Sequence, residues 1–353
     1  MLKNVLIVLD SFDYMEKEIE TRSNLSLICN PEFFYTRYEN KLIQFFQKTP
    51  LISGPLNHFG LWIISFYYVL TLSFKYKNFD SIIFINPIVG FFYSFLRRFK
   101  TSKENIVIAG FLFEPKVNRL YYNIRKKLVN FSYKATSKII VYGDSEVEYY
   151  NKIFPNLFGK FNYVKYGRDF KHVNSISFDC DFRFVGSGGR SNRDFGTLCK
   201  AMNLLYKKGV NIKSIIATRP ECENEETKAP NVKLQYGIKI NQFGAFINKS
   251  DFFVLPLVNK GISAGHMSML EAMSYGKLVV VSDIPSIRDY VDESIVYFYE
   301  PGNIIDLSNK LEYLYNHFED TVVSEKAIKG KKLYEEEYSF IALLMRITNL
   351  TIL

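Results

Sequence analysis

The chain has 353 residues, of which 48% are hydrophobic and 23% are charged. This length and composition are typical of a globular protein with two domains and exclude a disordered chain. Residues 1–178 carry 24 basic and 14 acidic side chains, whereas residues 179–353 carry 21 and 22, so the net charge of +9 comes from the first half. This distribution argues against a nucleic-acid-binding protein and indicates that the first half meets an anionic partner.

The cysteines and the N-terminus predict a cytoplasmic location. The four cysteines are far apart and form no Cys-x-x-Cys pair, which argues against a disulfide framework or a zinc site. The apolar run at 5–9 is too short for a signal peptide and lacks a cleavage site, so we interpret it as a first strand.

Apolar runs alternate with amphipathic stretches along the chain, which predicts parallel sheets built from right-handed βαβ units. The predicted strands are 5–9, 81–85, 105–109 and 138–142 in the first half, and 182–185, 214–217, 233–236, 251–255, 278–281 and 294–298 in the second. We therefore expect an α/β protein with two facing, doubly wound, Rossmann-like lobes and a site at strand C-termini in the cleft between them.

The predicted domains follow from these two series of strands. The N-terminal lobe spans 1–170 and the C-terminal lobe spans 179–325. A polar connection at 166–177 links them, and a helical segment at 326–353 packs back toward the first lobe.

The stretch from Phe59 to Phe74 contains no charged residue. At sixteen residues it is shorter than the roughly 20 that span a bilayer. It is either a buried helix of the first lobe or an interfacial helix whose aromatic face meets lipid. If the helix is interfacial, nearby basic residues would strengthen its contact with lipid. These are Arg97, Arg98, Lys100, Lys103, Arg125, Lys126 and Lys127.

A glycine-bearing loop leads into a helix within residues 251–290. The loop carries Gly261 and Gly265, and the helix starts near His266. Backbone amides at such a helix start bind anions, and the helix dipole adds to the attraction. Glu271 lies among apolar residues of this helix, where it either hydrogen-bonds sugar hydroxyls or faces solvent.

A second glycine-rich turn follows the strand predicted at 182–185. Gly188 and Gly189 would allow the main chain to approach phosphate oxygens, and Arg190 and Arg193 would bind them. The alternative is a solvated turn with no ligand.

Together the two segments resemble the nucleotide-sugar signature of GT-B glycosyltransferases, and more narrowly the bacterial group-1 family of retaining enzymes. The resemblance implies that Glu271 holds the donor ribose and that Arg190 and Arg193 bind the donor diphosphate. It also implies that the N-terminal lobe binds the acceptor and that the C-terminal lobe binds the nucleotide sugar. Ser263 stands eight positions before Glu271, where family members carry a second Glu that contacts the donor sugar, so the sugar and the stereochemical outcome stay open. The donor-binding residues implied are Ser187, Gly188, Gly189, Arg190, Arg193, Tyr236, Gly237, Ile238, Ser263, Gly265, His266, Met267, Ser268 and Glu271.

Candidate catalytic and acceptor-side residues complete the predicted site. Arg190 and Arg193 would stabilise the leaving group, and Glu114 is a candidate for acceptor contact or proton transfer. His266 either donates a hydrogen bond to the donor or packs on the loop, and His58 lies in a loop-like stretch of the first lobe. We discount Asp179-Cys180-Asp181 as a metal motif, because such triplets occur often by chance.

These observations predict a metal-independent, hexosyltransferase-type enzyme. It would move a sugar from a UDP- or GDP-linked donor to a hydroxyl acceptor, with no cofactor and no nucleic-acid partner. A glycan or lipid-linked acceptor would place it in bacterial surface polysaccharide or glycolipid biosynthesis, free in the cytoplasm or peripheral on the inner face of the cytoplasmic membrane. The alternatives are a nucleotide-sugar epimerase of the same fold and a non-catalytic, membrane-docked binding protein.

Overall fold

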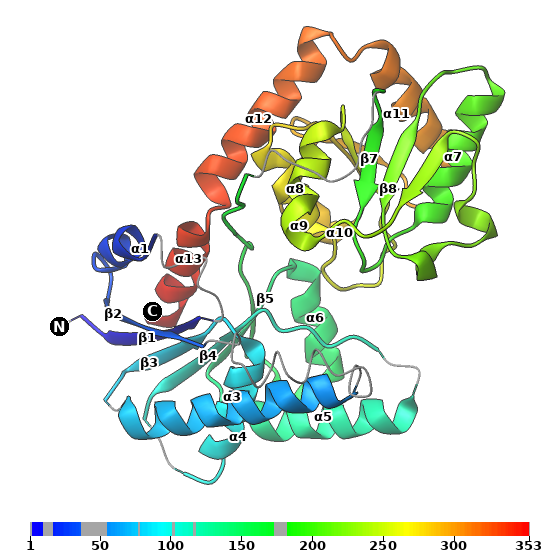
Figure 1. The fold of residues 1–353 in the computed structure, drawn as a ribbon. Coiled ribbons are helices and arrows are strands. Elements are labelled where there is room, and N and C mark those ends of the chain that lie inside the picture. The colour runs from blue at the N-terminus through cyan, green and yellow to red at the C-terminus, as the bar shows by residue number, and fades with distance from the viewer. Residues whose placement is uncertain are drawn as a thin grey trace. The chain divides into compact units, whose positions relative to one another are not determined.

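A computed structural model describes residues 2–9, 17–36, 55–76, 78–100, 103–115, 118–172 and 182–352, with backbone only for 55–61. The chain forms two compact units (Figure 1). Unit 1 comprises Met1–Val164 together with Leu344–Leu353, and unit 2 comprises Lys165–Leu343. The division thus falls a few residues before the predicted end of the first lobe, and it splits the predicted C-terminal segment between the units.

Unit 1 is built on a six-stranded parallel sheet in the order β2-β1-β3-β4-β5-β6. Its central strands are almost entirely apolar and buried, as expected for a parallel sheet that helices cover on both faces. The strands are β1 (Asn4–Leu9), β2 (Asn30–Tyr35), β3 (Ser81–Phe84), β4 (Asn105–Ala109), β5 (Lys138–Val141) and β6 (Phe161–Tyr163).

The helices of unit 1 divide between the two faces of its sheet. From β1 to β2 the chain moves across the sheet in one direction, and from β2 to β6 it moves in the other. Because such connections are right-handed, the helix between β1 and β2 lies on the opposite face from the helices that follow β2. In Figure 1, α3, α4 and α5 lie side by side on one face, with α4 packed between the other two. The helices are α1 (Glu18–Leu25), α3 (Pro55–Lys75), α4 (Pro87–Arg97), α5 (Arg119–Tyr133), α6 (Asp144–Ile153) and α13 (Phe340–Ile352).

Unit 2 is a second six-stranded parallel sheet, in the order β12-β11-β10-β7-β8-β9. Its strands are β7 (Val185–Gly188), β8 (Ser214–Ala217), β9 (Val232–Gln235), β10 (Phe253–Leu255), β11 (Val279–Ser282) and β12 (Tyr297–Tyr299). Its helices are α7 (Phe195–Lys207), α8 (Ile240–Lys249), α9 (His266–Ser274), α10 (Pro285–Arg288), α11 (Ile304–Asn316) and α12 (Thr321–Glu337).

Two hydrophobic cores sandwich the sheet of unit 2. One joins the sheet to α8, α9 and α10, and the other joins it to α7 and α11. Strand order reverses between β7 and β10, because the chain moves from β7 to β8 in one direction and from β10 to β11 in the other. Such a reversal leaves a crevice at the carboxyl ends of the two strands, where ligands bind in doubly wound folds.

The predicted fold class, two Rossmann-like doubly wound α/β lobes, is confirmed. Two strands begin three residues later than predicted: β7 spans Val185–Gly188 rather than 182–185, and β12 spans Tyr297–Tyr299 rather than 294–298. Gly188, which indicated a turn, pairs with Ala217 of β8 instead.

Candidate active site

The loops that follow β7 and β10 are tied together at the reversal point of unit 2. Arg193 and Leu257 form an isolated antiparallel bridge. Asp194 N donates to Pro256 O at 2.9 Å, and Val258 N donates to Asn192 O at 3.0 Å. The glycine-rich turn and the loop before α9 therefore form one surface, although Arg193 and Leu257 are 64 positions apart in the sequence.

Arg193 joins this surface to the start of α9. Its Nε donates to Gly188 O at 2.8 Å, Nη1 to Ser191 O at 2.8 Å and Nη2 to Ser268 Oγ at 3.2 Å. Burial lowers the pKa of the guanidinium to about 10, so Arg193 stays charged at neutral pH. These partners are neutral oxygens, and no carboxylate of the described residues offsets the charge.

Glycines at the end of β7 create the space that Arg193 occupies. Gly189 has a φ of +113°, and a Cβ built on it would lie 2.4 Å from Nη2 of Arg193. A Cβ on Gly188 would lie 2.8 Å from both Ala217 O and a ring carbon of Phe243. Any side chain at these positions would displace the guanidinium or separate the strands.

The N-terminus of α9 faces the same surface. Gly265 caps the helix with a φ of +86°, and a Cβ there would lie 2.8 Å from the buried side chain of Leu257. The first amides of the helix, those of His266, Met267 and Ser268, have no intrahelical acceptor by geometry. These helix-start amides and the cation of Arg193 together form a site suited to an anion.

The His266 side chain packs on the loop. Its ring is 6% exposed and stacks on Tyr290 with the centroids 4.3 Å apart. Burial lowers the pKa of His266 to about 4, so the ring is neutral, and Nε2 donates its proton to Ser286 O at 2.8 Å. The ring therefore has no N–H left for a donor, which favours the packed alternative and leaves the backbone amide as the available group.

Glu271 lies one turn further along α9, in a half-buried position against α8. A Cβ on Gly244 would lie 2.8 Å from Glu271 Oε1 and 2.8 Å from the Tyr275 hydroxyl. Burial raises the pKa of Glu271 to about 7, and the positive charge of Arg168 partly offsets this effect. Hydrogen bonds from hydroxyl groups would stabilise the charge of such a poorly solvated carboxylate, in agreement with the predicted contact to the donor ribose.

The remaining predicted donor residues lie at different depths around this surface. Ser187 is fully buried within β7, and among the described groups its hydroxyl has no hydrogen-bond partner. Arg190 and Met267 are exposed, while Ser263 is partly exposed in the loop before α9.

Tyr236, Gly237 and Ile238 follow the edge strand β9, with β8 between them and β7. The Tyr236 hydroxyl donates to Glu223 Oε2 at 2.6 Å, and this bond raises the pKa of Tyr236 to about 12. Gly237 has a φ of +79° with open space around it, and Ile238 packs on the core.

Predicted residues of the first lobe belong to unit 1. Glu114 is partly exposed in the segment after β4. His58 lies within α3, so the expectation that it occupies a loop is wrong. Asp179-Cys180-Asp181 lies outside the described residues. Within the described ranges there is no group of three His, Cys, Asp or Glu side chains that could hold a metal ion.

Several residues that shape the site were not predicted. The positive charge of Arg168, which lies in the segment predicted to be a polar linker, lowers the pKa of Glu271. Gly244 of α8 leaves space for the Glu271 carboxylate. Asn192 adopts a φ of +54° where the two loops meet. Only their three-dimensional neighbours reveal these roles, since none stands in a recognisable motif.

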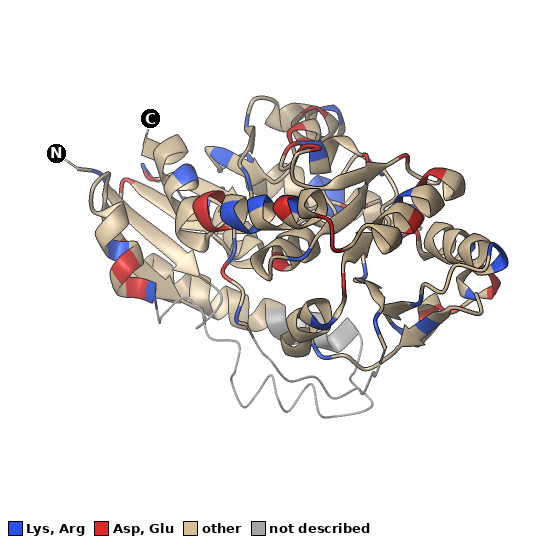
Figure 2. Ribbon diagram, turned by 90° about the horizontal axis from the view of Figure 1, so that it is seen from above, with Lys and Arg blue, Asp and Glu red and all other residues tan. Residues whose placement is uncertain are grey.

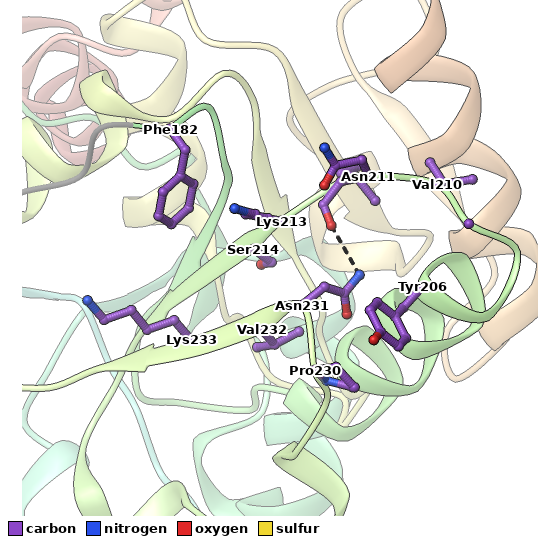
Figure 3. A pocket seen from close by; sticks show the side chains of 12 residues that line it. Phe182, Tyr206, Val210, Asn211, Lys213, Ser214, Pro230, Asn231, Val232 and Lys233 are labelled. Atoms are coloured by element: carbon purple, nitrogen blue, oxygen red, sulfur yellow. Dashed lines mark hydrogen bonds between the residues drawn. The ribbon is translucent and has the colours of Figure 1, made fainter.

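A pocket of about 410 Å³ lies at the opposite end of the strands (Figure 3). It is formed where the chain enters β8 and β9, around Lys213, Asn231 and Lys233. Within the pocket lining, Asn231 Nδ2 donates a hydrogen bond to Ile212 O at 3.1 Å and so joins the segments that lead into β9 and β8. The pocket is therefore separate from the surface at the carboxyl ends of β7 and β10.

The C-terminal half of the chain matches a known family. Residues 180–317 match the family described as glycosyl transferases group 1. A search of curated protein sequences finds no significant match.

Solved structures share the fold along the whole chain. A glycosyltransferase from Rickettsia africae is 14% identical, with a TM-score of 0.63, over 99% of this chain and 98% of its own. Starch synthase IV from Arabidopsis thaliana, bound to ADP and acarbose, is 10% identical with a TM-score of 0.66 and 99% of both chains covered. HepE from Anabaena in complex with UDP-glucose is 13% identical with a TM-score of 0.62, covering 99% of this chain and all of that one. These likenesses establish the GT-B fold.

Proposed function

We propose that this chain, whose residues 180–317 match the group 1 glycosyl transferases, moves a hexose from a nucleotide-diphosphate donor to a hydroxyl acceptor. The observation that carries the proposal is the partly buried Arg193, whose charge no described carboxylate offsets, in contact with Ser268 at the start of α9. This arrangement suits the diphosphate of the donor.

The chemistry follows from where charge develops. When the bond between the sugar and the diphosphate breaks, negative charge grows on the leaving phosphate oxygens. Arg193 and the amides of His266–Ser268 are held in place before the reaction, so they stabilise this charge without reorganisation. The exposed Arg190 adds a second guanidinium from the same turn. These groups supply the positive charge that the reaction requires, so we propose that no metal or cofactor is obligatory.

Glu271 fixes the donor at its ribose. Its carboxylate accepts hydrogen bonds only, and its partial burial strengthens those made to hydroxyls. The group-1 resemblance supports retention at the anomeric carbon. Solved structures with this fold contain UDP, UDP-glucose or ADP, which supports a nucleoside-diphosphate donor, with UDP- and GDP-sugars as the first to test.

The acceptor is a glycan or a lipid-linked glycan of a bacterial surface polysaccharide or glycolipid. The basic first half of the chain supports this assignment, since such acceptors lie at an anionic membrane. Glu114 is the proposed acceptor contact or proton-transfer group. The enzyme then works in the cytoplasm, at the inner face of the membrane.

The test is nucleotide binding and release with a panel of UDP- and GDP-sugars. We expect Arg193→Gln to reduce turnover about 10²- to 10³-fold and Glu271→Gln to weaken donor binding about tenfold or more. Arg183→Gln is the control, because Arg183 is exposed, pairs with Asp251 at 3.1 Å and stands only ten residues before Arg193. Failure of the wild type to bind any nucleotide sugar would contradict the proposal, and conversion of the donor sugar without nucleotide release would favour an epimerase.

A further inference from the structure

Three helices of unit 1 expose an unusual number of large apolar side chains. On α3, Trp62 is 49% and Phe74 is 75% exposed, and on α5 Leu120 is 71% exposed. These residues belong to stripes that recur at helical spacing, so each helix turns one apolar side outward. The exposed apolar residues are Trp62, Ile63, Phe66, Tyr67, Leu70 and Phe74 on α3, Ile88 and Phe99 on and after α4, and Leu120, Tyr121, Ile124, Leu128 and Phe131 on α5.

Aromatic contacts join these stripes into one surface, which we call the α3–α5 face. Phe92 of α4 meets Trp62 and Phe66 of α3, with ring centroids 6.4 and 6.2 Å apart. On the other side of α4, Phe99 meets Phe131 of α5 at 5.8 Å. The apolar surface therefore continues from α3 across α4 to α5, the three helices that lie side by side in Figure 1.

The α3–α5 face is also positively charged. None of its three helices contains Asp or Glu. The segment 55–134 carries 12 basic residues against three acidic ones. Of the acidic residues, Glu104 is paired with Arg97 at 2.7 Å, and Asp80 accepts the Asn4 amide at 2.8 Å. An apolar stripe bordered mainly by Lys and Arg is complementary to an anionic bilayer surface, which offers acyl chains and negative headgroups together.

We propose that the α3–α5 face docks unit 1 onto the surface of an anionic membrane. Within the described residues no helix has the length and hydropathy to cross a membrane, so α3 lies along the interface. Trp and Tyr on its outer side suit the headgroup region, where an amphipathic ring has one end apolar and the other wet. A second copy of the chain fits less well, because a symmetric contact would bring the same basic residues together.

Trp62 reports directly on this docking, since it is the only tryptophan of the chain. With vesicles that contain about a third phosphatidylglycerol, we expect its emission to shift to shorter wavelength and to be quenched by brominated acyl chains. Neutral phosphatidylcholine vesicles should bind far more weakly, and added NaCl should release the protein. Flotation with the same vesicles measures the bound fraction. No shift, or a shift that is indifferent to lipid charge and salt, would overturn the proposal.

Matched variants distinguish binding through the α3–α5 face from nonspecific electrostatic attraction of the whole protein to the vesicles. Lys100→Glu with Lys127→Glu should weaken vesicle binding about 25-fold or more, because each basic residue near an anionic surface is worth about fivefold. Lys207→Glu with Lys329→Glu makes the same change in net charge with exposed residues of unit 2 and should bind like the wild type. Equal loss in both double variants would overturn the proposal.

A second pair of variants tests the contribution of the exposed apolar side chains to vesicle binding. Phe74→Ser with Leu120→Ser should weaken binding about tenfold or more, whereas Ile328→Ser, at a 66% exposed position of α12, should not. Helix α12 mixes Lys and Glu along its length, unlike α3, α4 and α5, which contain neither Asp nor Glu. Figure 2 colours the basic residues blue and the acidic residues red. If the Phe74 and Leu120 changes instead dissolve a dimer in sedimentation experiments and leave vesicle binding intact, the face is a contact between copies and the proposal is wrong.

This inference deepens the membrane contact that belongs to the proposed function. Vesicle binding is measured without any sugar nucleotide, and donor binding is measured without lipid. A protein that binds vesicles but no donor would leave the docking surface standing and remove the transferase, and the converse result would do the reverse.

Discussion

At the scale of single residues, the candidate site depends on positions where a side chain is absent. Arg193 reaches Gly188 O because Gly189 leaves its guanidinium free space. The sequence motif indicates glycines for the approach of a phosphate, whereas the structure shows that Gly189 first accommodates the arginine. The cation is thus placed before any ligand arrives.

Gly189→Ala should therefore weaken nucleotide binding by about tenfold or more, because a Cβ would overlap the guanidinium and move it off its three acceptors. Gly209→Ala provides the matched control. Gly209 also has a positive φ, of +80°, but no atom within 4 Å of the added Cβ, so its substitution incurs backbone strain without touching the site. Calorimetric titration with UDP and GDP measures the difference, and equal affinities in the two variants would contradict the role of Gly189.

Glu271 makes the protein sensitive to pH. Since its pKa is raised to about 7 in the folded chain, the folded state binds a proton that the unfolded state releases near pH 4.5. Its contribution to stability is present in full below pH 4.5 and is lost as pH rises through 7, by up to about 3 kcal/mol. Denaturant unfolding of the wild type and Glu271→Gln should show this loss only in the wild type.

Donor affinity should change in the opposite direction. The ribose hydroxyls bind the ionised carboxylate, so affinity should rise as pH increases to about 7 and then level off. A donor affinity in Glu271→Gln with the same pH dependence as the wild type would assign the titration to another group.

At the scale of elements, the sequence predicts the buried strands well and the edges poorly. Runs such as those of β1 and β4 are continuous apolar segments, which a parallel sheet covered on both faces requires. β2 was missed because it is an edge strand, where Pro31 and Glu32 are tolerated. β7 was shifted because its glycines belong to the ladder, and only the neighbouring strands show that they pair.

The candidate site was predictable to a similar extent. Local motifs predict the anion-binding surface, since a glycine turn and a helix start carry their chemistry in a few consecutive residues. The sequence does not predict that Arg168 lies near Glu271 or that the His266 ring donates its proton to Ser286 O. It also does not predict that α8 requires a glycine at 244 to make room for the Glu271 carboxylate. These contacts join residues far apart in the chain, and hydrophobic periodicity holds no information about them.

At the scale of the whole molecule, the last helix completes the first unit. Lys3 Nζ donates to Ile352 O at 2.5 Å and Lys138 Nζ donates to Leu350 O, so the end of α13 lies against the starts of β1 and β5. Leu344 and Ile347 are fully buried. The predicted segment at 326–353 is therefore partly a structural component of unit 1.

Leu344→Ala should lower the free energy of unfolding by about 2–5 kcal/mol, because it leaves a cavity in a packed interior. Ile328→Ala, on the exposed side of α12, should change it by less than about 0.5 kcal/mol. Chemical denaturation measures both values. A Leu344→Ala protein as stable as the wild type would show that α13 is not part of the core of unit 1.

The return of α13 to unit 1 has a consequence for biosynthesis. A ribosome releases all of Lys165–Leu343 before it releases the residues that finish unit 1. Unit 2 can fold as soon as it emerges, whereas the sheet of unit 1 must wait, with one face incomplete, for a partner about 180 residues downstream of its last strand. At a synthesis rate of roughly 5–20 residues per second that interval is on the order of ten seconds or more. During this time the nascent first unit is the part of the molecule that most needs a chaperone.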